Sequence, residues 1–482
     1  MTIFLFITLL LGLILRIIGL NQSLWLDEAI GAIVVKNFGL GQIISQFIAH
    51  DNHPPLYYLV LKLWSLPFGY SEIALRSMSV LLGLGTIVIV FFIAKELFKK
   101  DKWTIIVSCL FLATSPFHIY YSQEARMYVM AGFFASLAIL SFLKTLQNKV
   151  SIAWWVVFSV SLPLLMFSDY MPVFLLPVFW LYPLIIKKDK SWWIKLVMAH
   201  LPLGILGLYW LPTFLTQSQN GKWLIANLPL WKSVAGGATL KQLGLVWVKF
   251  IFGRISFNNK AIYYSVIATI SLPLAFIVAR ALHFWRKLSF VWLWLVAPIL
   301  LGFIASIWFP AFVYFRYVFV LPAFYLLLAY GTASLKNTYS KYLFTGLILT
   351  VSLVSWTIYA VVPDQQRENW RKAVATVESR LKSGEAVAFE NPDAFTPFKW
   401  YSKTNKKEIG LVPKIGAKDS EIRAQANTQI EKLKGIYLFE YLKDINDPNG
   451  IARYIIEQSG FIKKDTLGGF GGVGKIDYFV RP

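Results

Sequence analysis

The sequence predicts a polytopic α-helical membrane protein, and three observations support this fold class. Of the 482 residues, 57% are hydrophobic and only 15% are charged, whereas soluble domains average about 45–50% apolar and about 25% charged residues. Apolar runs recur through the first 362 positions, and many approach the length of about 20 residues that crosses a bilayer. Lysine and arginine gather in the short gaps between these runs, as they do in cytoplasmic loops of membrane proteins.

The apolar runs predict about eleven membrane-spanning helices. They cover approximately residues 1–20, 73–94, 103–120, 127–146, 152–168, 171–186, 196–215, 261–279, 290–309, 317–335 and 342–362. The first run lacks the basic start and the small-residue cleavage site of a signal peptide, so we expect it to remain as a span. The run HPPLYYLVLKLW, residues 53–64, is shorter than a span. We expect it to lie along the membrane surface inside a large first outer loop, 21–72.

The distribution of positive charge predicts the orientation of the chain. If the N-terminus is cytoplasmic, most basic residues of the short loops also face the cytoplasm. These residues are Lys95, Lys99, Lys100, Lys102, Lys144, Lys149, Lys187, Lys188, Lys190, Lys195, Arg280, Arg286, Lys287, Lys336 and Lys341. We therefore expect an integral protein of a bacterial-type plasma membrane, with its C-terminal part outside the cytoplasm. Because these loops account for much of the net charge of +22, nucleic-acid binding is not expected.

Two further regions are expected on the outer side. Residues 217–260 form a long loop with an amphipathic stretch, LKQLGLVWVKFIFGR, which we interpret as a lid or a surface helix. From residue 363 the composition turns polar. Strand-like runs (EAVAFE, GIYLFEYL, KIDYFVRP) alternate there with helical ones (ENWRKAVATVESRL, NGIARYIIEQSG). The expected organisation is a transmembrane domain, 1–362, followed by a small extracytoplasmic α/β domain, 363–482.

The acidic residues are unevenly distributed. Sixteen of the 25 Asp and Glu residues follow position 362, and three of the other nine lie among the cytoplasmic lysines. The remaining six all fall in outer segments: Asp27, Glu28, Asp51, Glu72, Glu124 and Asp169. Carboxylates are costly near hydrocarbon, and those that remain there usually face a cavity. The six residues therefore indicate an acidic outer cavity at the level of the membrane.

The adjacent acids Asp27 and Glu28 permit two interpretations. A carboxylate near an acceptor hydroxyl can take its proton and act as a general base. Acidic residues are also favoured in the first turn of a helix, and the stretch SLWLDEAIGAIVV has the composition of a helix start. Spacing alone does not separate the two roles, and both can hold at once.

Three arginines lie near the same outer face. The stretch SPFHIYYSQEARMY contains Glu124 and Arg126. It is either an ordinary interfacial loop with an aromatic belt or a part of the acidic cavity. Arg76 begins the second predicted span and Arg316 the tenth. Each can form a local contact at a helix end or bind a phosphate group through two hydrogen bonds.

The sequence gives little support for a metal or a nucleotide. His50, Asp51 and His53 stand close together, but this spacing is only a weak signal for a divalent metal ion. The single cysteine, Cys109, excludes a disulfide framework and a multi-cysteine metal site. The run GGFGGVG, 468–474, stands between strand-like segments and is interpreted as a loop or hairpin rather than a phosphate cradle. Any donor of a transferred group is expected to be carried by a lipid and to reach the site through the bilayer.

Four N-terminal motifs resemble a known family. They are LWLDEA, HPPLYYLVLKLW, SEIALRSMSVLLG and SPFHIYYSQEARMY, in this order. The order is similar to that of membrane glycosyltransferases of the protein O-mannosyltransferase type, and the chain most resembles their bacterial branch (glycosyltransferase families 39 and 83). The resemblance covers about residues 1–146, and looser similarity extends to FRYVFVLPAFYLLLAYG and ENWRKAVATVE.

The resemblance implies a GT-C fold with surface helices in the first outer loop. It also implies transfer of a sugar from a polyprenyl-phosphate to an acceptor lipid, glycan or protein outside the cytoplasm. The implied catalytic residues are Asp27 as general base, Glu28 beside it, and Glu124. The implied ligands of the donor phosphate are Arg76, Arg126 and Arg316. The substrate cavity would be lined by Asp51, His53, Tyr121, Gln123 and Tyr128. No cofactor is implied with certainty, and a divalent metal remains an option.

The chain departs from this family in two respects, and two other functions are compared with its sequence features below. His53-Pro54-Pro55 stands where the aminoarabinose transferases have Lys-Pro-Pro, so modification of lipid A is not implied. The tail shows no β-trefoil of the eukaryotic O-mannosyltransferase kind.

A transporter or flippase for a lipid-linked sugar predicts ionisable residues inside spans and inverted repeats, and the sequence shows neither. A sugar-polymer ligase or polymerase of similar architecture is not distinguished by the sequence.

Overall fold

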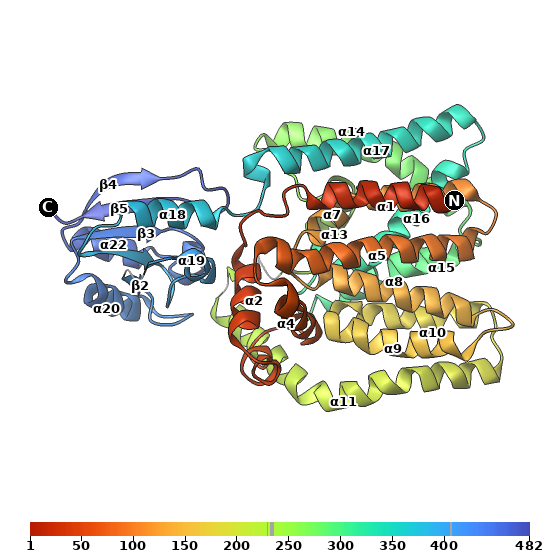
Figure 1. The fold of residues 1–482 in the computed structure, drawn as a ribbon, viewed down its shortest axis with the longest axis horizontal. Helices are drawn as coiled ribbons and strands as arrows, with labels where there is room; N and C mark the ends of the chain where they lie inside the picture. The colour runs from red at the N-terminus through yellow and green to blue at the C-terminus, as the bar shows by residue number, and fades with distance from the viewer. Residues whose placement is uncertain (229, 232–235, 405–406) are drawn as a thin grey trace. The chain divides into compact units, whose positions relative to one another are not determined.

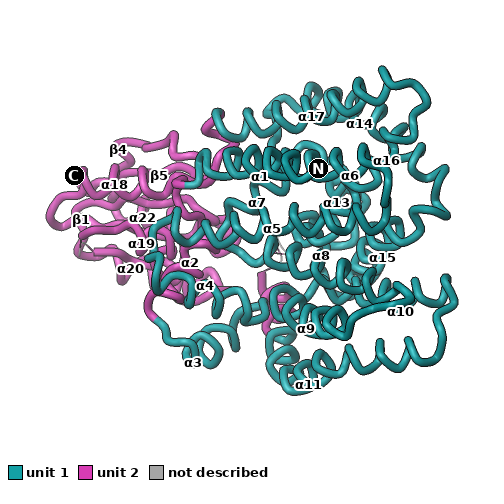
Figure 2. Tube along the Cα trace, turned by 45° about the vertical axis from the view of Figure 1, so that its right-hand side comes forward, with its two compact units in different colours: residues 1–20, 38–219, 235–361 teal, residues 21–37, 220–234, 362–482 magenta. Residues whose placement is uncertain are grey.

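The structure, a computed structural model, describes residues 1–228, 230–231, 236–404 and 407–482. It divides into two compact units (Figure 2). The first comprises residues 1–20, 38–219 and 235–361, and the second comprises 21–37, 220–234 and 362–482. The second unit therefore combines the C-terminal part of the chain with a short segment from its N-terminal region.

The first unit is built from helices (Figure 1). In chain order they are α1 (Thr2–Ile17), α3 (Leu40–Gln42), η1 (Ile43–Ile48), α4 (Leu56–Phe68), α5 (Glu72–Phe98), α6 (Lys102–Thr114), α7 (Pro116–Ser122), α8 (Tyr128–Thr145), α9 (Ile152–Ser168), η2 (Met171–Leu175), α10 (Leu176–Ile185), α11 (Lys190–Asn227), α13 (Leu240–Phe252), α14 (Lys260–His283), α15 (Ser289–Ala305), η3 (Tyr314–Val320), α16 (Leu321–Ala333) and α17 (Thr338–Val361). The last residues of α11 belong to the second unit. Every predicted span coincides with one or two of these helices.

The membrane class is confirmed, with a smaller number of clear spans than predicted. Within the described residues six helices are long and apolar enough to cross a bilayer, namely α5, α8, α11, α14, η3 with α16, and α17. The pair α6–α7, bent by 55°, makes a seventh if it is a single span. The helices α1, α9, η2–α10 and α15 are apolar but shorter, so the number of eleven remains a prediction. The surface-helix candidate at 53–64 forms α4, which has only 13 residues.

The spans differ in how much of their surface is packed. In the apolar windows of α8 and η3–α16, 78% and 89% of the residues are buried, against 11% in α11 and in α14. Because the exposed side chains of α11 and α14 are mainly apolar, these two helices have the composition of lipid-facing elements. The interior of the bundle is therefore formed around α8 and α16.

The break between α6 and α7 has a local cause. Pro116 has no backbone N–H and cannot continue the hydrogen-bond ladder of α6. The Ser115 hydroxyl accepts a hydrogen bond from the backbone N–H of His118 at 3.1 Å, which caps the new helix. The bend redirects the chain just before the SQEARMY motif, so it positions residues that the sequence associates with the cavity.

The second unit contains a mixed β-sheet. Its elements are α2 (Leu26–Asn37), η4 (Pro363–Gln365), α18 (Trp370–Arg380), β1 (Glu385–Phe389), α19 (Thr396–Tyr401), β2 (Glu408–Gly410), α20 (Asp419–Ile430), β3 (Gly435–Phe439), α21 (Lys443–Asn446), α22 (Ile451–Gln458), β4 (Ile462–Leu467) and β5 (Ile476–Val480). Within the described residues the strand order is β2-β1-β3-β5-β4. Strands β2, β1 and β3 are parallel to one another. Strand β5 pairs antiparallel with both β3 and β4.

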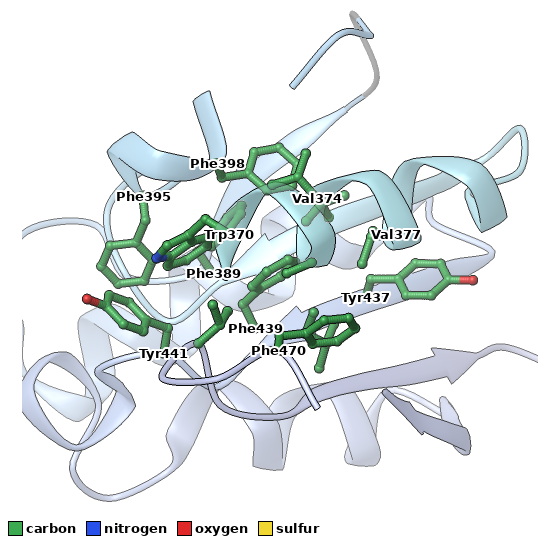
Figure 3. Close-up of a cluster of buried hydrophobic side chains, with 14 of the residues drawn as sticks. Trp370, Val374, Val377, Phe389, Phe395, Phe398, Tyr437, Phe439, Tyr441 and Phe470 are labelled. Carbon is green, nitrogen blue, oxygen red and sulfur yellow. The ribbon is translucent and has the colours of Figure 1, made fainter. Parts of the chain in front are cut away.

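Helices cover both faces of this sheet. Successive strand residues point to opposite faces, so Val387 and Phe389 pack on one side, against α18 and α19 (Figure 3). Ala386 and Ala388 pack on the other, against α20 and α22. The predicted α/β architecture is confirmed, with three strand runs and two helical runs where the sequence placed them. The sequence did not predict α19, β2, α20 or β4.

The predicted outer region 217–260 is only partly a loop. Residues 229 and 232–235 lie outside the described residues. Within the described part, α11 continues to Asn227, and the amphipathic stretch forms α13 as predicted. A role of this region as a lid stays a prediction.

Candidate active site

The predicted catalytic pair lies in the first turn of α2. Glu28 is only 1% exposed, and its Oε2 accepts a hydrogen bond from the backbone N–H of Trp25 at 3.4 Å. A Glu in the third helical position that bonds the residue before the helix is one half of a capping box. The helix-start interpretation therefore holds for Glu28. Asp27, one position earlier, is half-buried, and its role as base stays a prediction.

The segment that carries the pair is bound to the C-terminal part of the chain. The Leu24 N–H donates to the Tyr401 hydroxyl at 2.8 Å, and the Arg371 N–H donates to the Ser23 hydroxyl at 3.1 Å. The ammonium group of Lys36 lies 5.2 Å from the centre of the Trp400 ring. The orientation of α2 therefore depends on residues more than 300 positions later in the chain.

In the first unit, Arg126 and His53 form part of one polar chain. The Arg126 guanidinium donates to the Tyr58 hydroxyl at 2.8 Å and approaches His53 Nε2 at 3.4 Å. His53 Nδ1 lies 3.2 Å from the Asp51 carboxylate. Since a guanidinium can only donate, Nε2 of His53 must accept, which leaves the ring proton on Nδ1 to bond Asp51. The structure thus brings three of the predicted cavity residues together.

The contacts of Asp51 and His53 leave little capacity to bind a metal ion at this position. Desolvation opposes the charge of Asp51, but His53, Arg126 and the Asn52 N–H together hold the pKa of this carboxyl below its ordinary value. Both ring nitrogens of His53 are engaged, and His50 Nδ1 lies 3.1 Å from the Gln46 carbonyl. Among the residues that the structure describes, no group of three His, Cys, Asp or Glu side chains is placed to hold a metal ion.

The junction of α7 and α8 gathers the other predicted cavity residues. Gln123, Glu124 and Tyr121 are each 1% exposed. The Gln123 amide donates to the carbonyls of Arg16 and Ile18 at 2.8 and 2.7 Å, which ties the junction to the end of α1. The Tyr121 and Tyr128 rings lie 5.4 Å apart in an edge-to-face arrangement, a geometry that stabilises aromatic pairs.

Arg16 was not singled out by the sequence and proves to anchor this junction. Its side chain is fully buried and donates to the carbonyls of Gly12 and Ala113 at 2.8 and 3.0 Å. It also donates to the Ser122 hydroxyl at 3.2 Å and lies 2.7 Å from Nδ1 of His118. The only sequence signal was an arginine inside an apolar span, which is expensive unless it has partners.

Arg254, after α13, is a second residue that the sequence did not single out. It lies over the ring of Tyr120, 5.0 Å from the ring centre, and its charge interacts with Tyr121, Tyr314 and Glu124. The residue is nevertheless exposed to solvent. A guanidinium of an exposed residue that lies among tyrosines is a suitable ligand for an anion.

Arg76 and Arg316 differ in accessibility. Arg76 is fully buried and donates to the Leu20 carbonyl at 2.9 Å, so at least part of its role is structural. Arg316 lies in η3 and is half-buried. Its neighbour Phe315 packs on Tyr128, with ring centres 5.2 Å apart. The segment that carries Arg316 therefore contacts the α7–α8 junction.

These contacts define what the first unit can do chemically. Four segments of it converge: the loop before α4, the α7–α8 junction, the loop after α13, and η3. They supply carboxyls from Asp51 and Glu124 and cationic groups from Arg126, Arg254 and Arg316, among several tyrosines. Such a set can bind a phosphate group and stabilise the charge that develops on it when it leaves. Asp27 and Glu28 belong to the second unit.

The fold matches those of several solved glycosyltransferases. ArnT from Cupriavidus metallidurans bound to undecaprenyl phosphate superimposes with a TM-score of 0.57 at 11% identity, over 100% of this chain and 98% of that one. The Archaeoglobus fulgidus oligosaccharyltransferase tethered with an acceptor peptide gives 0.53 at 12% identity, over 99% and 74%. The mycobacterial arabinofuranosyltransferase AftD gives 0.50 at 15% identity, over 99% and 40%. The chain therefore shares the fold of these glycosyltransferases.

A second comparison matches part of the chain to a known family. Residues 52–216 match the family described as dolichyl-phosphate-mannose-protein mannosyltransferase. No curated protein sequence matches the chain. The resemblance drawn from the four motifs is therefore confirmed: a part of the chain matches this family, and the whole chain shares the fold of the ArnT glycosyltransferase.

Proposed function

We propose that the chain transfers a sugar from a polyprenyl-phosphate to an acceptor hydroxyl on the extracytoplasmic side, with Asp27 as the general base. Asp27 takes the proton of the acceptor hydroxyl. The acceptor oxygen then bonds to the anomeric carbon while the bond from that carbon to the phosphate oxygen breaks. The polyprenyl phosphate leaves with the electron pair of that bond. One such displacement inverts the configuration of the anomeric carbon.

The leaving phosphate is neutralised by arginines of the first unit. Arg126, Arg254 and Arg316 stand on segments that converge at the α7–α8 junction, and Arg76 is retained as a further candidate. Glu124 and Gln123, with Tyr121, Tyr128, Asp51 and His53, orient the sugar. The observation that carries this proposal is the exposed residue Arg254, whose charge interacts with Glu124 and the tyrosines, in a chain that matches the dolichyl-phosphate-mannose-protein mannosyltransferase family over residues 52–216.

The donor and acceptor are proposed by class. ArnT is bound to undecaprenyl phosphate, which supports a polyprenyl carrier here, and the oligosaccharyltransferase is tethered with an acceptor peptide. The acceptor of this chain is a hydroxyl-bearing lipid, glycan or protein. The proposed topology has eleven spans, a cytoplasmic N-terminus, the region 217–260 as a lid, and the sheet domain outside the cytoplasm.

The base assignment is tested by the Asp27→Asn substitution. Loss of a general base typically slows a reaction by about 10²–10⁴-fold, so we expect transfer of radiolabelled sugar from a polyprenyl-phosphate donor to fall by at least roughly 10²-fold. The exposed Asp364 of the same unit provides a control, and Asp364→Asn should retain full transfer. Undiminished turnover in Asp27→Asn, with both variants folded, would reject Asp27 as the base.

A further inference from the structure

Glu368, just before α18, is held by three hydrogen-bond donors. The Trp370 indole N–H donates to its Oε2 at 2.8 Å, and the Tyr441 hydroxyl donates to its Oε1 at 2.9 Å. The carboxyl also accepts a hydrogen bond from the backbone N–H of Leu26. Trp370 is fully buried in the core that α18 forms with the sheet (Figure 3). The Glu368 carboxyl is therefore fixed to the rigid part of the second unit.

The same carboxyl lies beside the predicted base. Leu26 and Asp27 are the first two residues of α2, so Glu368 bonds the N-terminus of the helix that carries Asp27. Both Glu368 and Tyr441 interact electrostatically with Asp27, and the Leu26 side chain packs against the core that contains Trp370. All of these residues belong to the second unit, so the arrangement is internal to it.

The glycine-rich run 468–474 completes this arrangement. The Asn369 N–H lies 2.9 Å from the Phe470 carbonyl and 3.1 Å from that of Gly471. Gly472 has φ +66, and a Cβ there would lie 2.7 Å from Cγ of Glu368. Only glycine fits this conformation and this distance without strain. The run is a loop, as the sequence predicts, and it packs closely against the Glu368 side chain.

We propose that Glu368 is a positioning residue for Asp27, and that the sheet domain is thereby a working part of the catalytic apparatus. The inference rests on the proposed role of Asp27 as base. Glu368 fixes the start of α2 through Leu26, and its charge acts on the carboxyl that takes the acceptor proton.

The charge of Glu368 changes in the neutral range. Partial burial raises the pKa of Glu368 to about 7, while hydrogen bonds from Trp370 and Tyr441 lower it and the Asp27 charge raises it. Among the described residues, Asp27 from α2 and Tyr441 after β3 are titratable groups that act on the Glu368 carboxyl. The glycine-rich loop adds none. Above neutral pH a second negative charge therefore stands beside Asp27, where it favours uptake of the acceptor proton.

The test is the pH profile of transfer by the full chain in membranes or detergent. Glutamine has the shape of protonated glutamate, so Glu368→Gln should behave at every pH like the wild type at pH 6. We expect wild-type kcat to rise roughly tenfold between pH 6 and 8, the order of effect of one contact to a charged group, and the variant to lack this rise. Tyr441→Phe removes a donor that lowers the Glu368 pKa, and it should move the midpoint of the rise to higher pH.

Controls separate this inference from the proposed function. Glu378→Gln removes a carboxyl from α18 that is bonded instead by Ser402 and Thr404, and it should keep the wild-type rise. If Asp27→Asn transfers normally, the base assignment fails. If Asp27→Asn is inactive and Glu368→Gln keeps the wild-type rise, the positioning role alone is rejected. An equal loss at all pH values in Glu368→Gln, or an unshifted midpoint in Tyr441→Phe, also contradicts it.

Discussion

Asp27 and Glu28 are adjacent in the chain but have different surroundings. Glu28 is buried and caps the helix on which both stand, so its carboxyl is occupied by a structural task. Asp27 is half-buried and lies beside Glu368 and Tyr441. A shift of one position in a helix turns a side chain by about 100°, which is enough to separate a cap from a candidate base.

Glu390 offers a prediction about stability at the residue scale. It is 1% exposed, and desolvation, together with Asp447 and Glu440, raises its pKa from 4.5 to about 8 against the opposing effect of Arg453. A group whose pKa is higher in the folded protein than in the unfolded one stabilises the folded state when it is protonated. This stabilisation is complete below the unfolded pKa and is lost as the pH rises through the folded pKa. We expect the melting temperature of the full chain to fall between pH 6 and pH 9.

Glu390→Gln should flatten this dependence, because glutamine does not ionise. The contribution involved is on the order of a few kcal/mol, which is measurable by thermal melting at stepped pH. Glu457→Gln, at an exposed position of α22, is the control and should melt with the wild-type pH dependence. Parallel curves for Glu390→Gln and the wild type would contradict the assignment.

At the scale of elements, the site depends on interruptions of helices. The α6–α7 break, the short π-helix η1 and the 3-10 helix η3 each replace regular α-helix near the residues that converge in the first unit. Irregular backbone inside a membrane protein is tolerated where neighbouring elements satisfy its polar groups. The Arg16 side chain does so for the end of α6, since it donates to the Ala113 carbonyl, and the Gln123 side chain does so for the end of α1, since it donates to the Arg16 and Ile18 carbonyls.

The contact of α14 with α16 gives a prediction about packing. A Cβ at Gly331 would lie 2.4 Å from the Ile277 carbonyl oxygen, so the two backbones approach as closely as small residues allow. Gly331→Ala should destabilise the bundle by about 1–3 kcal/mol, the usual cost of overpacking. A Cβ at Gly346 of α17 meets nothing within 4 Å, and Gly346→Ala should cause no loss. Equal thermal stability of the two variants in detergent would show that the contact tolerates a methyl group.

At the scale of the whole molecule, the orientation in the membrane is the main prediction to test. The basic loops predict a cytoplasmic N-terminus and an outer sheet domain. Because Cys109 is the single cysteine and is 1% exposed, introduced cysteines can be labelled selectively. With a membrane-impermeant maleimide, Lys464→Cys in β4 should react in intact cells. Lys149→Cys, in an exposed loop position after α8, should react only after lysis. The reverse pattern would invert the topology.

Much of the fold was accessible from the sequence, and so were several residues that the structure brings together. The SQEARMY and HPP motifs named Glu124, Arg126, Asp51 and His53, and the structure brings the last three into one hydrogen-bonded chain. Arg254 and Arg16 were missed, because each is a lone arginine whose partners are distant in sequence. Their significance depends on Tyr120, Glu124 and His118, which no local pattern connects to them.

The sequence by itself determined that this is a helical membrane protein with a separate α/β domain, and its motifs indicated the glycosyltransferase family. These properties depend on apolar length, strand alternation and short motifs, which are local. Only the tertiary structure decided that the segment 21–37 is bound to the C-terminal domain and that Glu368 stands beside Asp27. Such contacts join residues separated by hundreds of positions, and their energy depends on the packing of complete elements rather than on the composition of any one of them.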